Sequence, residues 1–189
     1  MRCAVLVTVP GNSARQPEHV MSQLSFTSFD SSLLVRDAHG HYLMATADQI
    51  LEAARQVIDQ KMQRGASFTS PAAVKEYLRA KLSGYEHEVF AVLFLDTQHR
   101  LIDYAEMFRG TIDSASVHPR EVVKAALQRN AAAVILSHNH PSGSPEPSRA
   151  DQALTVQLRS ALALVDVRTL DHVIVAGSVT TSFAERGLL

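Results

Sequence analysis

The sequence predicts an α/β fold in which a mixed β-sheet is flanked by α-helices. The first observation is a set of apolar segments of strand length, at residues 89–95, 131–137 and 170–176. The second is that segments with helical periodicity lie between them. Strands that alternate with helices are typical of a sheet with helices packed on its faces. A length of 189 residues suits one such domain with a short N-terminal extension.

The elements of the main domain can be placed from their start and stop signals. A hydroxyl residue before Pro71 begins a helix, and Gly84 ends it. Residues 89–95 and 101–108, joined by a polar turn, predict an antiparallel hairpin, and Pro119 begins the next helix. The remaining elements are a strand at 131–137, a helix at 149–165, a strand at 170–176 and a last short strand at 179–183.

The N-terminal part of the chain is expected to be distinct from this domain. We divide the chain into a divergent, flexible segment at residues 1–45, a linking helix within 46–66 and the main domain at 67–189. Within the first segment, residues 33–35 and 42–44 predict a weak hairpin. His39 and His41 lie between them without a carboxylate or cysteine at a useful spacing, so we expect exposed loop histidines. The linking helix is amphipathic, which makes a homodimer interface a candidate role for it.

Composition excludes several classes of partner. The chain has 18 basic and 19 acidic residues, so no global field attracts nucleic acid or an anionic membrane. Cys3 is the one cysteine, which excludes an intrachain disulfide and a cysteine-rich metal site. No apolar run approaches the roughly 20 residues that span a bilayer. We therefore expect a cytoplasmic protein without membrane association or direct nucleic-acid binding.

Two histidines follow the predicted strand at 131–137, and they point to a zinc site. His138 and His140 share one face of an extended segment, and Asp151 lies in the first turn of the next helix. Three such ligands leave a fourth position for water, as in catalytic zinc sites. The alternative is structural, because Ser148 with Asp151 is also a helix-capping pattern and the histidines could be hydrogen-bonded loop residues. Their convergence at one strand-to-helix junction favours the metal.

The spacing His138-x-His140, seven residues, Ser148, two residues, Asp151 resembles the JAMM (MPN+) metalloprotease signature. The central residue is usually Ser or Thr in the deubiquitinating members, whereas it is Asn139 here. A narrower resemblance, over about residues 67–189, is to the bacterial RadC (UPF0758) family. It is carried by the segments at 117–121, 138–143, 170–172 and 182–187. The resemblance implies a JAMM/MPN, cytidine-deaminase-like fold.

The resemblance also implies a role for each site residue. His138, His140 and Asp151 match the zinc ligands, and Ser148 matches the serine that stabilises the tetrahedral oxyanion. The catalytic glutamate of the family precedes the first core strand, which makes Glu88 the expected general base. Two other glutamates, Glu106 in the second strand and the more distant Glu86, stay open as alternatives. Asp171 and His172 are candidates either to orient the ligands or to make structural hydrogen bonds.

The expected activity is zinc-dependent hydrolysis of a peptide, amide or isopeptide bond in an unknown protein or peptide substrate. A second hypothesis, implied by the RadC resemblance, is a DNA-repair-associated binding factor, and a third is a metal-dependent nuclease. Full-length RadC proteins resemble one another in an N-terminal helix-hairpin-helix region, and residues 1–45 depart from that pattern. The near-neutral charge also argues against direct DNA binding.

Overall fold

A computed structural model describes residues 6–8, 33–61, 68, 70–110 and 117–189. The chain forms two compact units, residues 1–57 and 58–189, and each is described by itself. The predicted boundaries at residues 45 and 66 stay a prediction. Most of the segment expected to be flexible, at 1–32, and the expected end of the linking helix near Gly65 lie outside the described residues.

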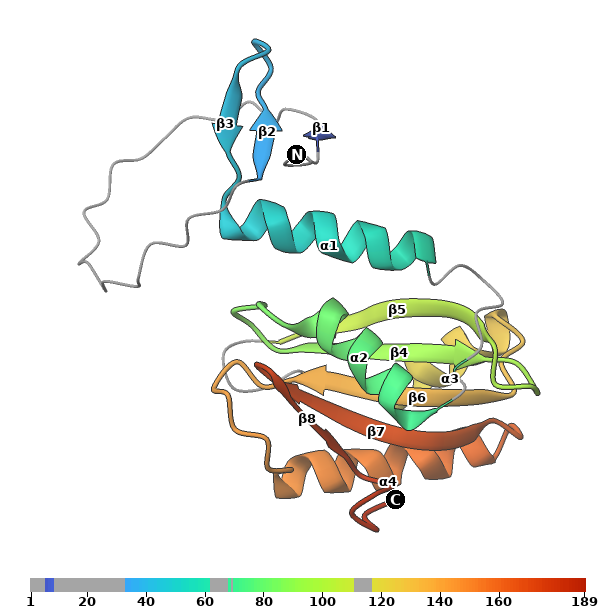
Figure 1. The fold of residues 1–189 in the computed structure, drawn as a ribbon. Helices are drawn as coiled ribbons and strands as arrows, with labels where there is room; N and C mark the ends of the chain where they lie inside the picture. Colours follow the sequence, from blue (N-terminus) through green and yellow to red (C-terminus); the bar gives the residue numbers. More distant parts are fainter. Residues whose placement is uncertain (1–5, 9–32, 62–67, 69, 111–116) are drawn as a thin grey trace. The chain divides into compact units, whose positions relative to one another are not determined.

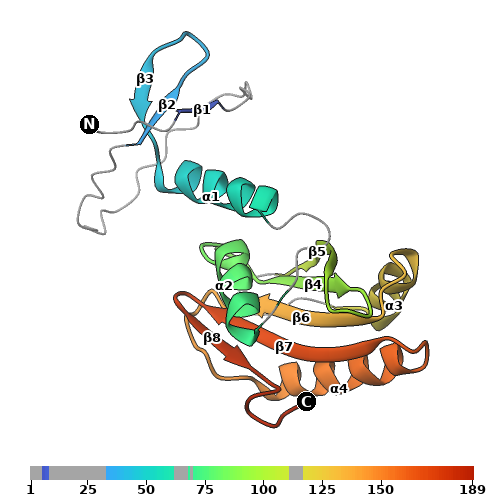
Figure 2. The ribbon, with the colours of Figure 1, turned by 45° about the vertical axis from the view of Figure 1, so that its right-hand side comes forward.

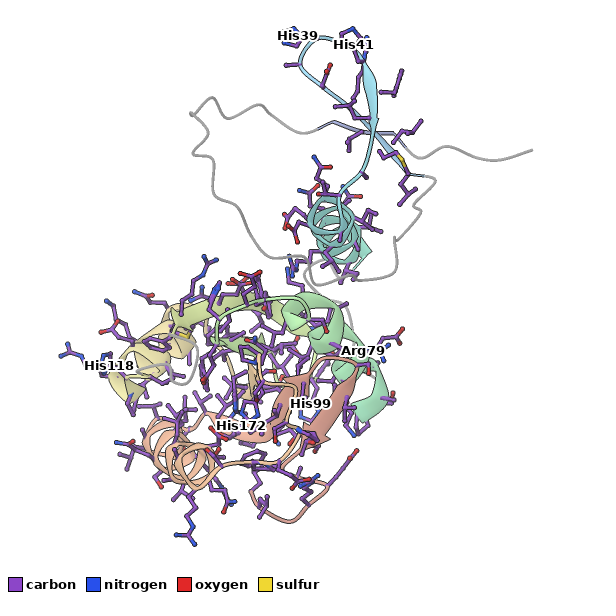
Figure 3. The ribbon with its side chains drawn as sticks, turned by 90° about the vertical axis from the view of Figure 1, so that its left-hand side faces the viewer. His39, His41, Arg79, His99, His118 and His172 are labelled. Atoms are coloured by element: carbon purple, nitrogen blue, oxygen red, sulfur yellow. The ribbon has the colours of Figure 1, made fainter. Side chains whose placement is uncertain are left out.

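The N-terminal unit contains a small sheet and a helix. Its strands, in the order β1-β2-β3, are β1 (Leu6–Thr8), β2 (Leu34–Arg36) and β3 (Tyr42–Met44). The helix α1 (Ala47–Lys61) follows them, and its residues 58–61 belong to the second unit. The antiparallel pairing of β2 with β3 confirms the predicted hairpin. His39 and His41 are exposed near the tip of this hairpin, as expected (Figure 3). Asp37 accepts hydrogen bonds from the backbone N–H groups of both, at 2.9 and 2.8 Å.

The C-terminal unit is built on a five-stranded mixed sheet (Figure 1). Its order is β5-β4-β6-β7-β8, in which the one parallel pair, β6 with β7, lies between antiparallel neighbours. The bounds are β4 (Val89–Leu95), β5 (Leu101–Arg109), β6 (Ala133–Asn139), β7 (Arg168–Ala176) and β8 (Val179–Ser182). This sheet, with its helices, confirms the predicted α/β fold.

Helices cover both faces of this sheet. The described helices of the unit are α2 (Pro71–Leu82), α3 (Pro119–Gln128) and α4 (Arg149–Ala163). One buried cluster joins α2 to the side chains of Val89, Ala91 and Leu93, whereas another joins α3 and α4 to the intervening Phe90 and Val92. Successive side chains of β4 therefore pack alternately into two cores, one on each face of the sheet. Figure 2 shows α2 on one side of the sheet and α4 on the other.

Three predicted elements have bounds that are wrong by about two residues, and one of them is β7, which begins at Arg168 instead of Leu170. β6 begins at Ala133 and runs through His138 to Asn139, because pairing with β4 and with β7 continues past the apolar residues. α4 ends at Ala163 instead of Val165. Asp166 adopts a positive φ of 58° shortly after that end, so the chain turns back towards β7.

The helices of the described residues include none that is both long and apolar enough to cross a membrane.

Candidate metal centre

The three predicted ligands lie together at one end of the sheet. One ring nitrogen of each histidine and one carboxylate oxygen of Asp151 are all within 4.8 Å of one another. The Nε2 atoms of His138 and His140 are 2.9 Å apart. Asp151 places Oδ1 3.4 Å from Nε2 of His138 and Oδ2 3.6 Å from Nε2 of His140. Among the described residues, this is the one group of three or more such side chains that could hold a metal ion.

Strand pairing explains why both histidines reach Asp151. His138 pairs with Phe90 in the antiparallel ladder of β4 and β6. The backbone N–H of His140 donates to the carbonyl of Val175 at 2.8 Å, which keeps the chain extended beyond β6. Alternate residues of an extended chain share a face, so both rings turn towards the first turn of α4.

The helix cap places Asp151. The Oγ of Ser148 accepts a hydrogen bond from the backbone N–H of Asp151 at 3.1 Å, and the carboxylate of Asp151 accepts one from the N–H of Ser148 at 2.7 Å. The capping pattern considered as an alternative to the metal site is therefore present. It does not compete with metal binding, because Oδ1 faces His138 while Oδ2 is shared between Ser148 and His140.

Each histidine is held through the ring nitrogen that faces away from Asp151. Nδ1 of His140 lies 2.7 Å from the carbonyl oxygen of Ser144. A carbonyl only accepts, so Nδ1 carries a hydrogen, and in the neutral ring the lone pair of Nε2 is available. Nδ1 of His138 lies 2.8 Å from Nε2 of His172, a buried histidine of β7. The structure thus brings His172, a candidate for orienting a ligand, against His138.

The electrostatics of the cluster suit a cation. Burial raises the pKa of Asp151, but the hydrogen bonds of His138 and His140 outweigh it and hold the pKa far below its usual range. The hydrogen bond with Asp151 is the main cause that raises the pKa of His140, and the charge of Glu88 adds to it. Burial lowers the pKa of His172. Two nitrogens and an ionised carboxylate around one point are a donor set that fits a metal ion.

Glu88 lies at the same end of the sheet. Glu88 directly precedes β4 and is half-buried. Its negative charge contributes to raising the pKa of His140. The other two candidates are placed differently. Glu106 of β5 accepts hydrogen bonds from the Tyr85 hydroxyl at 2.9 Å and from Arg109 at 3.2 Å, so both of its oxygens are engaged away from the ligands. Glu86 is exposed in the preceding turn.

Asn139 holds the backbone on both sides of Glu88. Its Oδ1 accepts a hydrogen bond from the N–H of Val89 at 2.7 Å, and its Nδ2 donates to the carbonyl of His87 at 3.0 Å. The side chain of Asn139 is buried on the face of the sheet opposite His138. Asn139 therefore links β6, the strand that carries His138, to the segment that carries the candidate base Glu88. This role could not be found from the sequence, because the predicted strand ended at residue 137 and the backbone partners of Asn139 lie about 50 positions earlier in the chain.

Other polar residues near the site have structural partners. Asp171 accepts hydrogen bonds from Ser182 Oγ at 2.6 Å and from the N–H of Ala184 at 3.0 Å, so it anchors the C-terminal turn. Thr155, on α4, was not singled out from the sequence, yet its hydroxyl contacts His172 at 2.6 Å. Its spacing of one helical turn from Asp151 was the signal that could have found it.

The comparisons with known proteins define the class. The model of the RadC-like JAB domain matches residues 68–188, and the chain belongs to this family. The match confirms the RadC resemblance and the fold that it implied. Family membership, together with the cluster of His138, His140 and Asp151, fits a metal-dependent hydrolase.

The particular relatives are UPF0758 proteins. One from Vibrio cholerae is 60% identical over 141 residues, which cover 75% of this chain and 89% of that protein. One from Methylibium petroleiphilum is 62% identical over 140 residues, covering 74% of this chain but only 63% of the relative. One from Thioalkalivibrio sulfidiphilus is 54% identical over 167 residues, covering 88% and 73%. Their names state no activity.

Proposed function

We propose that this protein is a zinc-dependent hydrolase that cleaves a peptide, amide or isopeptide bond in a protein or peptide substrate. The observation that carries the proposal is the convergence of His138, His140 and Asp151 on one point. Glu88 is close enough for its charge to help raise the pKa of His140. Membership of the RadC-like JAB family supports the proposal, because that family fits a metal-dependent hydrolase.

Zinc is the metal that this donor set favours. Two imidazole nitrogens and one carboxylate oxygen match the ligand types of catalytic zinc. Three protein ligands leave a position open for water or substrate. When bound, zinc would act as a Lewis acid and lower the pKa of a coordinated water to about 7.

The residues of the chain would move protons and stabilise charge. In the proposal, the carboxylate of Glu88 accepts a proton from the attacking water and gives it to the leaving amine. The Oγ of Ser148 uses a lone pair to accept from the N–H of Asp151, so its O–H group can donate to the developing oxyanion. Asn139 would keep Glu88 in place through its two backbone hydrogen bonds.

The test combines metal content with hydrolysis by matched glutamate variants. Protein loaded with zinc is incubated with a library of quenched fluorogenic peptides and with isopeptide-linked substrates. We expect cleavage by the wild type, loss of zinc and cleavage in Asp151→Ala, and loss of cleavage with retained zinc in Glu88→Gln. Glu106→Gln is the control and should keep both. Metal-dependent cleavage of DNA without peptide cleavage would overturn the proposal in favour of a nuclease.

A further inference from the structure

His172 is a buried histidine whose two ring nitrogens both make polar contacts. It lies inside the C-terminal unit, between the sheet and α4 (Figure 3). Nε2 is 2.8 Å from Nδ1 of His138, and Nδ1 is 2.6 Å from Oγ1 of Thr155. The ring also stacks on Phe183 with centroids 4.7 Å apart. An apolar side chain could fill this space, so the two nitrogens need their own explanation.

The hydrogen bonds of Thr155 determine which nitrogen of His172 carries hydrogen. The Thr155 hydroxyl donates its one hydrogen to the backbone carbonyl of Asp151 at 2.6 Å, and a carbonyl only accepts. The contact of Oγ1 with His172 must therefore use a hydrogen from Nδ1 of His172. A neutral imidazole has one N–H, so Nε2 of His172 is left as an acceptor.

Metal binding at His138 requires the same tautomer of His172. A metal bound at Nε2 of His138 needs that lone pair, so Nδ1 of His138 must carry the proton. Nδ1 of His138 then donates to Nε2 of His172, which is the acceptor that the Thr155 end requires. Three hydrogen bonds in one direction need three hydrogens, and two neutral rings and one hydroxyl supply one each.

We propose that His172 and Thr155 are positioning residues that fix the Nδ1–H tautomer of His138 and so hold its Nε2 ready for the metal. The inference rests on the proposed function, because it assigns the metal to Nε2. The chain of hydrogen bonds runs from one metal-binding residue, His138, to the backbone of another, Asp151. It therefore also fixes the first turn of α4 relative to the end of β6.

The neutral acceptor has a consequence for the metal. Histidine ligands commonly donate to a carboxylate or a carbonyl, and a carboxylate raises the basicity of the ring. Here the acceptor for His138 is an uncharged ring, so His172 orients the ligand without adding negative charge. Asp151 is then the one carboxylate within the metal-binding group. A bound ion would therefore keep more of its positive charge for polarising a substrate than it would if His138 donated to a carboxylate.

The test removes one hydroxyl at a time and measures the zinc dissociation constant by competition with a chromogenic chelator. Thr155→Val removes the acceptor for His172 at nearly constant shape, and Thr155→Ser restores it. Thr169→Val is the matched control, because the Thr169 hydroxyl, on the same strand as His172, is buried with no hydrogen-bond partner among the described residues. We expect Thr155→Val to weaken zinc binding about 10- to 100-fold. The Ser variant and the control should stay within about threefold of the wild type.

A second measurement determines the tautomers directly, and it uses the wild-type protein, so it does not depend on the folding of a variant. The ¹⁵N chemical shifts of the imidazole rings report which nitrogen carries hydrogen. The expected result in the zinc-loaded protein is hydrogen on Nδ1 of both His138 and His172. Hydrogen on Nε2 of His172, or zinc binding unchanged in Thr155→Val, overturns the inference. If the wild type binds no zinc, the proposed function fails, and the tautomer of His172 in the metal-free protein still decides whether this chain of hydrogen bonds exists.

Discussion

The two histidines proposed to bind the metal are two residues apart, yet they belong to different kinds of structure. His138 is part of the core: its side chain is 2% exposed, pairs with His172 and packs beside Phe90. His140 lies at the start of a loop: its side chain is 16% exposed, and a carbonyl of that loop, from Ser144, holds it. Folding of the core thus places one ligand, and the conformation of a loop places the other.

Replacing the two histidines should differ most in its effect on the free energy of unfolding of the metal-free protein. His138→Ala removes a buried ring and leaves Nε2 of His172 without its partner, so we expect a loss of about 2–4 kcal/mol in the free energy of unfolding. His140→Ala should cost less than about 1 kcal/mol. Urea unfolding of the metal-free variants measures both values. Equal losses would show that the two ligands are supported alike.

A second prediction concerns the residue between the histidines. Asn139→Ala removes one buried and one partly buried hydrogen bond to the backbone beside Glu88, and it leaves the N–H of Val89 without its partner. We expect a loss of about 1–3 kcal/mol, measured by urea unfolding, with zinc affinity nearly unchanged because Asn139 faces away from the ligands. Loss of zinc binding with an intact fold would instead place Asn139 in the metal site.

The pH dependence of zinc binding tests His140, the histidine held by the loop. The hydrogen bond to Asp151 raises the pKa of His140 in the metal-free protein. The ring therefore keeps its second proton, and its positive charge, at pH values above the usual pKa of about 6.5. Zinc must displace that proton, so affinity should fall by up to about tenfold per pH unit as the pH drops through the raised pKa. The same shift stabilises the metal-free fold at low pH, and that contribution is lost as the pH rises through the raised pKa. Chelator competition from pH 5.5 to 8 measures the affinity, and a flat profile would contradict the assignment.

The smallest effect is expected from the ion pair of the loop. Glu146 accepts two hydrogen bonds from Arg186, at 2.6 and 3.0 Å, and both side chains lie at the surface. Water screens such a pair, so Glu146→Gln should change zinc affinity by less than about threefold and leave the thermal midpoint within error. A larger loss of zinc affinity, with the midpoint unchanged, would show that this ion pair sets the position of His140.

The sequence predicted most of the fold because the strands and helices carry strong periodicity and clear start signals. The ends of β6 and α4 were misplaced because strand pairing and a positive φ at Asp166, which depend on other parts of the chain, decide them. The ligand group was predictable because its members are close in sequence. The contact of His172 with His138 joins residues 34 positions apart, and β6 and β7 must pair before it exists.

The most direct test of the central claim is the metal content of the protein, purified without chelators and measured by plasma mass spectrometry. We predict one zinc ion per wild-type chain and essentially none in Asp151→Ala, while Glu106→Gln keeps the wild-type value. A wild-type chain that remains free of zinc even after incubation with excess zinc and dialysis would contradict the assignment of His138, His140 and Asp151 as a zinc site.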